Sequence, residues 1–294
     1  MRDWRRVRVP ASSANLGPGF DGLALAAGMY LECRFRESDT LRIRASGRDA
    51  GEISCGEDNL IWQAAVRCGA RTPLELEISN DIPLGKGLGS SAAAVTAGVV
   101  IASALGNCGW DRARVLEESA RIEGHPDNVA ACALGGVTAS AADAAGRARA
   151  VRIRLHENFR IGVVIPDFRL PTSQSRGVLP EFYSRRDAIF NIQHASLLTA
   201  ALASGDRSVF PEALEDRMHQ PYRYRLVPGL EEITRLRACG LLGCALSGAG
   251  PSLLVFYERG ADSVCEIVAQ AFAGHGHRCE IWRGEIPQNG YEVF

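Results

Sequence analysis

Short apolar runs, separated by glycine, proline or asparagine, dominate the first 150 residues of the chain. Runs of this length with alternating or β-branched residues predict strands. They fall at residues 7–9, 30–35, 41–45, 74–78 and 137–140. The residues after Val9-Pro10 predict a polar, glycine-rich turn, and residues 141–150 predict a surface hairpin.

Longer stretches with capping residues or helical spacing predict helices. Residues 60–68 follow Asp58 and Asn59, either of which can cap a first turn, and Asp111 can cap a helix that reaches about residue 122. The apolar run at residues 92–105 predicts a buried helix. Further helices are predicted at about residues 186–203, 230–239 and 262–272, and further strands at 151–155, 161–165, 244–246, 252–257 and 278–282.

Strands and helices mix in both halves without the regular alternation of a parallel βαβ fold, and this favours an α+β protein. A length of 294 residues suits one large domain or two of ordinary size. We expect two closely associated domains, at residues 1–150 and 151–294, with the boundary just beyond the predicted hairpin.

Composition and charge argue against several classes of function. The chain is 46% hydrophobic and 23% charged with a net charge of −1, so neither a nucleic acid nor an anionic membrane is indicated as a partner. The nine cysteines stand singly without a C-x-x-C pair, which is typical of reduced thiols in the cytoplasm. We expect no secretory signal, and the apolar run at residues 92–105 is too short to span a membrane.

The clearest chemical signal is a glycine-rich segment that leads into the apolar helix. Three glycines in five residues allow tight turns and close approach to an anion, and the free N–H groups at the helix start carry partial positive charge. Together they predict a phosphate-binding site. The segment lacks the G-K-[ST] triplet of Walker A and the third glycine of the dinucleotide fingerprint. It comprises Pro83, Leu84, Gly85, Lys86, Gly87, Leu88, Gly89, Ser90, Ser91, Ala92 and Ala93.

Position for position, this segment resembles the ATP motif of the GHMP kinases, which include galactokinase and the homoserine, mevalonate and phosphomevalonate kinases. Two further segments resemble the other signatures of that family, in the family's order. They are P-A-S-S-A-N-L-G-P-G-F-D at residues 10–21 and L-S-G-A-G-P-S at residues 246–252. The resemblance implies ATP as phosphate donor and Mg²⁺ as cofactor, with Ser91 helping to hold the ion.

Within the family, the first motif is similar to that of the homoserine kinases and lacks the G-R-x-N-x-I-G-E-H pattern of galactokinase. This similarity implies phosphorylation of the side-chain hydroxyl of L-homoserine, a step of threonine biosynthesis, with Asn15 and Asp21 in the amino-acid pocket. A carboxylate suits the ammonium group of such a substrate, and an amide can orient it. Another small alcohol, such as mevalonate or shikimate, is an alternative acceptor, and a ligand-binding relative without activity is a second alternative.

The segment E-G-H-P-D-N at residues 123–128 also resembles the homoserine kinases and departs from the H-G-x-P-S-G-x-D run of mevalonate kinase. Mevalonate kinase and galactokinase use an aspartate as general base here, whereas Asn128 cannot accept a proton. We therefore expect catalysis by positioning and charge neutralisation, with Asn128 and His125 orienting the hydroxyl and the substrate. Mg²⁺ takes one or two protein oxygens, for which we prefer Ser91 and Glu123, with Glu117 in reserve.

Arginine is the usual partner for the carboxylate of an amino-acid substrate, because its planar guanidinium can donate two parallel hydrogen bonds. Two arginines lie in runs that resemble those of the homoserine kinases. Arg176 ends the run T-S-Q-S-R that begins at Thr172, and Arg223 ends the run H-Q-P-Y-R that begins at His219. Thr172, Arg176 and Arg223 are therefore candidate substrate-binding residues.

The resemblance implies a fold as well as an activity. We expect an N-terminal domain similar to domain 2 of ribosomal protein S5, including a left-handed βαβ crossover, and a ferredoxin-like C-terminal domain. The active site is expected between the two domains. The resemblance also implies a homodimer.

Overall fold

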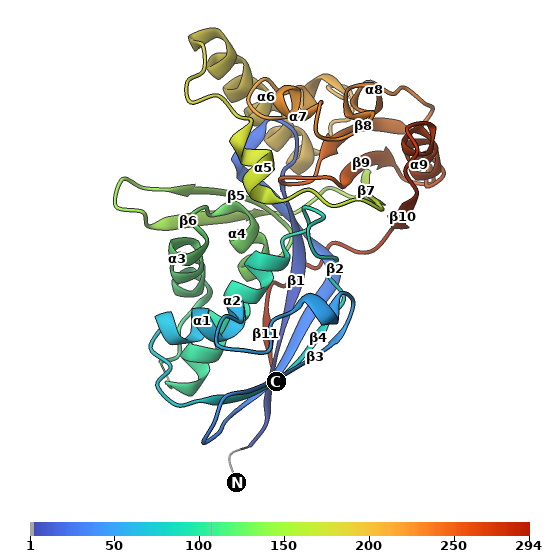
Figure 1. Cartoon of the computed structure of the whole chain (residues 1–294). Helices are drawn as coiled ribbons and strands as arrows, with labels where there is room; N and C mark the ends of the chain where they lie inside the picture. Colours follow the sequence, from blue (N-terminus) through green and yellow to red (C-terminus); the bar gives the residue numbers. More distant parts are fainter. Residues whose placement is uncertain (1–2, 107) are drawn as a thin grey trace.

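The computed structural model describes residues 3–106 and 108–294, and these residues form two sheets with helices packed on them (Figure 1). The larger sheet has seven strands in the order β11-β1-β2-β4-β3, with β5 also paired to β2 and β6 to β5. Its strands are β1 (Arg5–Asn15), β2 (Gly19–Glu37), β3 (Arg42–Gly47), β4 (Leu74–Asn80), β5 (Val137–Ala142), β6 (Ala148–Ile153) and β11 (Glu292–Val293).

Four helices cover this sheet, and Figure 1 shows them together on one side of it. They are α1 (Leu60–Arg67), α2 (Ser90–Leu105), α3 (Arg112–Glu123) and α4 (Asp127–Leu134), with a 3-10 turn η1 at Ala50–Glu52. The apolar helix α2 lies at the centre of the core and packs against α1, α3, α4 and β1. Most residues of α2 are apolar, which suits this buried position, although the buried hydroxyl of Thr96 has no hydrogen-bond partner among the described residues.

The smaller sheet is antiparallel throughout, in the order β10-β7-β9-β8. Its strands are β7 (Phe159–Pro166), β8 (Leu241–Leu246), β9 (Leu253–Glu258) and β10 (Cys279–Trp282). The helices of this part are α5 (Thr172–Gly177), α6 (Arg185–Ser204), α7 (Gln220–Arg223), α8 (Leu230–Thr234) and α9 (Val264–Gly274), with a 3-10 turn η2 at Glu212–Leu214. The two sheets confirm the expected α+β class.

The C-terminal tail returns from the smaller sheet to the larger one. Strand β11 pairs with β1, and Tyr291 N–H donates to Cys132 O, a carbonyl near the end of α4. In addition, β6 continues to Ile153 within the larger sheet. The division into residues 1–150 and 151–294 stays a prediction, because chain segments from beyond residue 150 complete the first sheet.

The predicted strands and most predicted helices are confirmed, although β1 and β2 are much longer than predicted, since β2 begins at Gly19 rather than near residue 30. The side chain of Asn59 caps α1, and that of Asp111 caps α3. Two predictions are wrong. The turn predicted directly after Pro10 comes later, at residues 16–18, because β1 continues to Asn15 as the partner of β2. The helix predicted at residues 230–239 ends at Thr234. The residues after it lead to Gly240, which has a positive φ and directly precedes β8.

Candidate active site

A cavity between the two sheets is lined by every segment that carries candidate chemistry. The first motif, the glycine loop, the α3–α4 junction, α5, α7 and the β8–β9 turn all contribute to its wall. Three of the predicted loop residues do not reach it: Leu84, Ala92 and Ala93. The other predicted site residues line it. They are Asn15, Asp21, Pro83, Gly85, Lys86, Gly87, Leu88, Gly89, Ser90, Ser91, Glu123, His125, Asn128, Thr172, Arg176 and Arg223.

Positive backbone angles shape the glycine loop. Gly85, Gly87 and Gly89 have φ values of +68°, +74° and +68°, which L-residues with a side chain rarely adopt. A Cβ on Gly87 would lie 2.2 Å from the carbonyl oxygen of Ser247, and one on Gly89 would meet the hydroxyl of Ser12. The loop therefore needs glycine both for its turns and for its close packing. It ends at Ser90, the first residue of α2, whose N-terminus faces the cavity.

A chain of hydroxyl groups joins the three motifs. The Ser247 hydroxyl donates to Gly87 O at 2.6 Å and lies 2.7 Å from the Ser13 hydroxyl. Because Ser247 has only one hydroxyl proton, Ser13 is the donor in the second contact. The first motif, the glycine loop and the third motif thus have a fixed relative position, although more than 230 residues separate Ser13 from Ser247.

The Lys86 side chain is directed away from the phosphate-binding face of the loop. It is 7% exposed, and its Nζ donates to the carbonyl oxygens of Pro166 at 2.7 Å and Phe168 at 2.6 Å. Burial lowers the pKa of this ammonium group, and the nearby Arg169 lowers it further. Lys86 thereby links the glycine loop to the end of β7.

The two preferred metal candidates lie side by side. Ser91 Oγ donates to Glu123 Oε2 at 3.0 Å, at the start of α2 and the end of α3. Burial raises the pKa of Glu123, because partial removal from water disfavours the charged form of a carboxyl group. Glu117, the reserve candidate, pairs instead with Arg114 on the outer face of α3 at 3.2 Å. The described residues contain no group of three or more metal-binding side chains.

Asn128 and His125 are both oriented by neighbouring side chains. Ser12 Oγ donates to Asn128 Oδ1 at 2.9 Å, so the amide NH₂ of Asn128 is left for the cavity. Asp127 Oδ1 accepts from the backbone N–H of Asn128 at 2.7 Å and lies 2.6 Å from His125 Nδ1. Burial lowers the pKa of His125, but the hydrogen bond and charge of Asp127 outweigh it, and the net pKa is raised.

Opposite charges meet at the other end of the cavity. Arg176 Nη2 donates to Asp21 Oδ1 at 2.8 Å, and Nη1 donates to Oδ2 at 3.3 Å. Asn15 Oδ1 accepts from the backbone N–H of Asp21, and Asn15 Nδ2 donates to Gly248 O. Asn15 and Asp21 have φ values of +74° and +54°, a strained conformation for non-glycine residues that tends to occur where function requires it.

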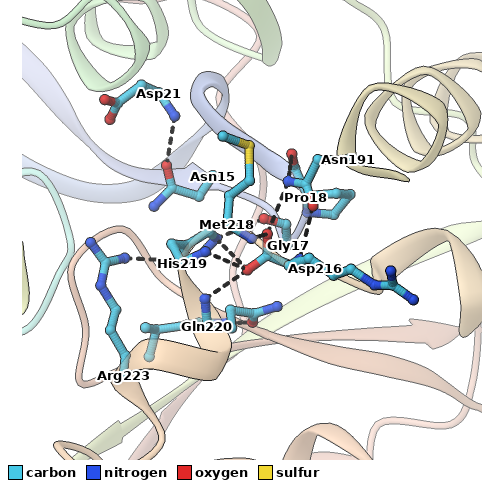
Figure 2. Close-up of polar contacts among 12 residues, drawn as sticks. Asn15, Gly17, Pro18, Asp21, Asn191, Asp216, Met218, His219, Gln220 and Arg223 are labelled. Carbon is cyan, nitrogen blue, oxygen red and sulfur yellow. Dashed lines mark hydrogen bonds and ion pairs between the residues drawn. The ribbon is translucent and has the colours of Figure 1, made fainter. Parts of the chain in front are cut away.

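Arg223 is a buried cation beside this pair. It is 1% exposed, and burial together with the charge of Arg176 lowers its pKa to about 10. Figure 2 shows it next to His219, whose imidazole Nδ1 lies 2.9 Å from Arg223 Nη1. The rings of Phe20 and His219 are stacked at 5.3 Å. The guanidinium carbons of Arg176 and Arg223 each lie 5.9 Å from the centre of the Phe20 ring.

Comparisons with known proteins identify the family of this chain. A family model described as GHMP kinases N terminal domain matches residues 59–136, and one described as GHMP kinases C terminal matches residues 198–274. Homoserine kinase from Solibacter usitatus is 61% identical over 99% of this chain and 97% of its own length. The chain belongs to the homoserine kinase family of the GHMP kinases. Homoserine kinase from Moorella thermoacetica is 40% identical over 94% of this chain and 95% of its own length.

Solved structures show the same fold. The crystal structure of homoserine kinase from Cytophaga hutchinsonii matches with a TM-score of 0.87 at 26% identity, covering 100% of this chain and 98% of that one. A galactokinase from Lactococcus lactis shares the fold with a TM-score of 0.66 at 15% identity, covering 99% of this chain and 95% of that one. The expected two-domain GHMP kinase fold is therefore confirmed for this member of the homoserine kinase family.

Sequence reasoning missed several residues of this homoserine kinase family site. Phe20, Asp127 and Leu170 line the cavity, and His219 contacts Arg223 without reaching the cavity wall. One signal was available for His219. It stands four residues before Arg223, a spacing that places two side chains on the same face of a helix.

We expect a pH-dependent contribution of His125 to stability. Its pKa is raised in the folded protein, so protonation favours folding: the contribution is complete below the ordinary pKa of about 6.5 and is lost as pH rises through the folded value. The free energy of unfolding, measured with urea across this range, should therefore fall less steeply with pH in His125→Asn than in the wild type. Parallel curves for the two proteins would contradict this assignment.

Proposed function

We propose that this protein transfers the γ-phosphate of ATP to the side-chain hydroxyl of L-homoserine. The observation that carries the proposal is the arrangement of charge along one cavity, with a phosphate-binding loop at one end and Asp21, Arg176 and Arg223 at the other. An acceptor that carries both an ammonium and a carboxylate group matches the second end. Mevalonate and shikimate have no ammonium group to replace Arg176 as the partner of Asp21 when Arg176 binds the carboxylate.

The substrate end supports one orientation of the amino acid. Asp21 accepts the ammonium group, with Asn15 orienting it. Arg223 and Arg176 receive the carboxylate, and Thr172 adds a hydroxyl at the first turn of α5. In this arrangement the Asp21–Arg176 ion pair separates when the zwitterion binds. Asp21 then pairs with the ammonium group of the substrate, and Arg176 pairs with its carboxylate. The side-chain hydroxyl of homoserine then extends toward Asn128 and the glycine loop.

A second cavity supports a position for the adenine base. It adjoins the first, because Ser90 lines both, and its wall is mainly apolar, with Ile53, Leu60, Ile61 and Leu84 among the lining residues. Apolar walls with a few polar groups are typical of sites for planar ligands. Asn59 and Asn80 also line this cavity. Leu84, which does not reach the first cavity, would contact ATP here.

Ser91 and Glu123 fit a Mg²⁺ site. Their two oxygens adjoin the N-terminus of α2, and the hydroxyl of Ser91 now satisfies a carboxylate whose pKa is raised by burial. Mg²⁺ commonly binds one or two protein oxygens and completes its shell with phosphate and water. Bound there, the ion would neutralise charge on the phosphate groups. Glu123 is the better candidate than Glu117, whose carboxylate already pairs with Arg114.

The remaining residues support catalysis without a general base. Asp127 Oδ1 accepts two hydrogen bonds, and Asp21 pairs with Arg176 at the opposite end of the cavity. Asn128 offers its NH₂ group as a donor, which can orient the oxygen of the acceptor hydroxyl. The hydroxyl proton then passes to a phosphate oxygen late in the transfer, as a loose transition state permits. His125 adds positive charge near the transferred group when it is protonated.

The decisive test is a coupled ADP-release assay with Mg²⁺ and ATP. It compares L-homoserine with mevalonate, galactose, shikimate and no acceptor, and it identifies the product as O-phospho-L-homoserine. Turnover on homoserine alone is the expected result. Activity on a different acceptor would replace the substrate assignment, and binding of ATP without turnover on any acceptor would favour a ligand-binding protein without activity.

We expect Glu123→Gln to reduce kcat at saturating ATP by about 100-fold or more, because the amide removes the charge that holds the cation. The Mg²⁺ concentration for half-maximal rate should rise at the same time. Glu117→Gln is the matched control on the same helix. It breaks only a surface ion pair, which contributes less than about 1 kcal/mol, and should leave the magnesium requirement unchanged. An equal loss in both variants would contradict the assignment of Glu123.

We also propose a cytoplasmic location, a role in threonine biosynthesis and a homodimer. The cysteines of the described residues are all free thiols, as is usual in a reducing compartment. No described helix is both long and apolar enough to cross a membrane. Fractionation of the cell and the mass in solution by light scattering test location and oligomeric state.

A further inference from the structure

Arg223 is held only by neutral acceptors. Its Nε donates to Ser175 O at 3.1 Å, and its Nη1 donates to Gly248 O at 3.1 Å and to His219 Nδ1 at 2.9 Å. Among the described residues, no acceptor contacts Nη2 and no carboxylate forms an ion pair with Arg223. A cation that is 1% exposed and lacks an anionic partner is costly to bury, so this site is prepared for an anion.

The contact with Arg223 determines the state of His219. A guanidinium can only donate hydrogen bonds, so His219 Nδ1 must accept, and the imidazole is neutral with its proton on Nε2. Nε2 donates this proton to Gly17 O at 2.7 Å. Both ring nitrogens are thereby used, and the complete burial of the side chain lowers its pKa, in agreement with the neutral form.

Asp216 is the nearest carboxylate to His219, and its oxygens are already occupied. Oδ2 accepts from the backbone N–H groups of His219 and Gln220, and Oδ1 accepts from the backbone N–H of Met218 and the side chain of Asn191 (Figure 2). Asn191 also donates to Pro18 O. This network fixes the backbone at His219 against the first motif. Asp216 acts on Arg223 through its charge alone, without an ion pair between the two side chains.

We propose that His219 is a positioning residue that orients Arg223 toward the carboxylate of the acceptor and so determines selectivity for carboxylate-bearing acceptors. The inference rests on the proposed function, because it concerns the same substrate site. The imidazole fixes the guanidinium without neutralising it. An aspartate in its place would also accept from Nη1, but it would compensate the charge that the substrate carboxylate needs.

A purely structural role for His219 is the competing explanation. The stack on Phe20 and the hydrogen bond to Gly17 could serve only to join α7 to the first motif. That role predicts an equal loss for every acceptor. Positioning of Arg223 predicts a loss only for acceptors that carry a carboxylate, so an acceptor without this group separates the two explanations.

The experiment measures kcat/KM for L-homoserine and for 3-aminopropan-1-ol, which is homoserine without its carboxylate. The ratio of the two values is the carboxylate preference. His219→Phe keeps an aromatic ring on Phe20 but removes the acceptor, and it should lower the preference by about 10- to 100-fold. His219→Asn loses the ring but keeps a neutral acceptor near the position of Nδ1, and it should retain most of the preference. Where aminopropanol reacts too slowly, its inhibition constant against homoserine replaces kcat/KM.

The outcomes separate the possibilities. An unchanged preference in His219→Phe, or a greater loss in His219→Asn than in His219→Phe, would overturn the inference in favour of packing. In an Arg223→Ala background, His219→Phe should change the preference no further, and a further loss would also overturn it. Melting temperatures show whether His219→Phe or His219→Asn fails to fold. If one of them fails, the carboxylate preference of the other tests the inference. A wild type that does not phosphorylate homoserine would refute the proposed function, and the inference with it.

Discussion

Gly87→Ala should reduce kcat/KM for ATP by about 100-fold or more. The added Cβ would lie 2.2 Å from Ser247 O and 2.8 Å from the backbone of Gly250, and neither backbone can move without disturbing the β8–β9 turn. The residue must also keep a φ of +74°, which is unfavourable for alanine by about 1–2 kcal/mol. Displacement of a positioning loop by about 1 Å commonly reduces activity by this factor. The measurement is ADP release as a function of ATP concentration.

Gly85→Ala is the matched control for this prediction. Gly85 has a similar φ of +68°, but its Cβ would contact only the side chain of Arg169, at 3.4–3.5 Å. This variant should therefore show the strain of alanine without the steric conflict, and its kcat/KM should stay within about 10-fold of the wild type. Near-equal effects in the two variants would mean that backbone strain, rather than contact with Ser247, limits the loop.

The parts of the site that depend on local backbone could be predicted from the sequence. The spacing of the glycines predicted the turns of the loop, and the capping residues Asn59 and Asp111 predicted where two helices begin. The three motifs also predicted the fold, through their resemblance to the GHMP kinases. Each of these signals lies within a short stretch of residues, because turns and caps depend on neighbours along the chain.

The partners of the charged side chains could not be predicted in the same way. Lys86 lies in the glycine loop, yet its ammonium group binds carbonyls 80 and 82 residues later in the chain. Asp21 and Arg176 were expected to bind opposite ends of a substrate, and the structure shows them paired with each other. Partner choice of this kind depends on tertiary contacts between distant segments, which residue type and spacing do not report.

The tertiary contacts of the C-terminal tail could not be predicted from the sequence either. Residues near the C-terminus contain Pro287 and Gly290, and their composition is that of a loop. In the structure, Pro287 O accepts from Gly136 N–H, and the tail closes the end of α4, the helix that begins with Asp127 and Asn128. A division by chain order places this segment with the second sheet, although its contacts are with the first.

Arg223→Ala should raise KM for homoserine more than Arg176→Ala. Removal of one partner from a buried, hydrogen-bonded charge pair costs about 2–5 kcal/mol, which corresponds to roughly 30-fold or more in binding. Arg223 is 1% exposed, so it belongs to this class. The side chain of Arg176 is 39% exposed and pairs with Asp21, so its contact with the substrate is more screened, and its loss should cost less than about 10-fold.

The nucleotide serves as internal control for both arginine variants. Neither arginine belongs to the glycine loop, so KM for ATP should stay within about 3-fold of the wild type in each, since changes remote from a contact leave it largely intact. Arg223→Ala removes the side-chain donor to Ser175 O and leaves Gly248 O with Asn15 as its side-chain donor, so its melting temperature must be measured beside the kinetics. A larger rise in KM for Arg176→Ala would show that the carboxylate binds at the exposed arginine, and that the charge of Arg223 acts on the structure rather than on the substrate.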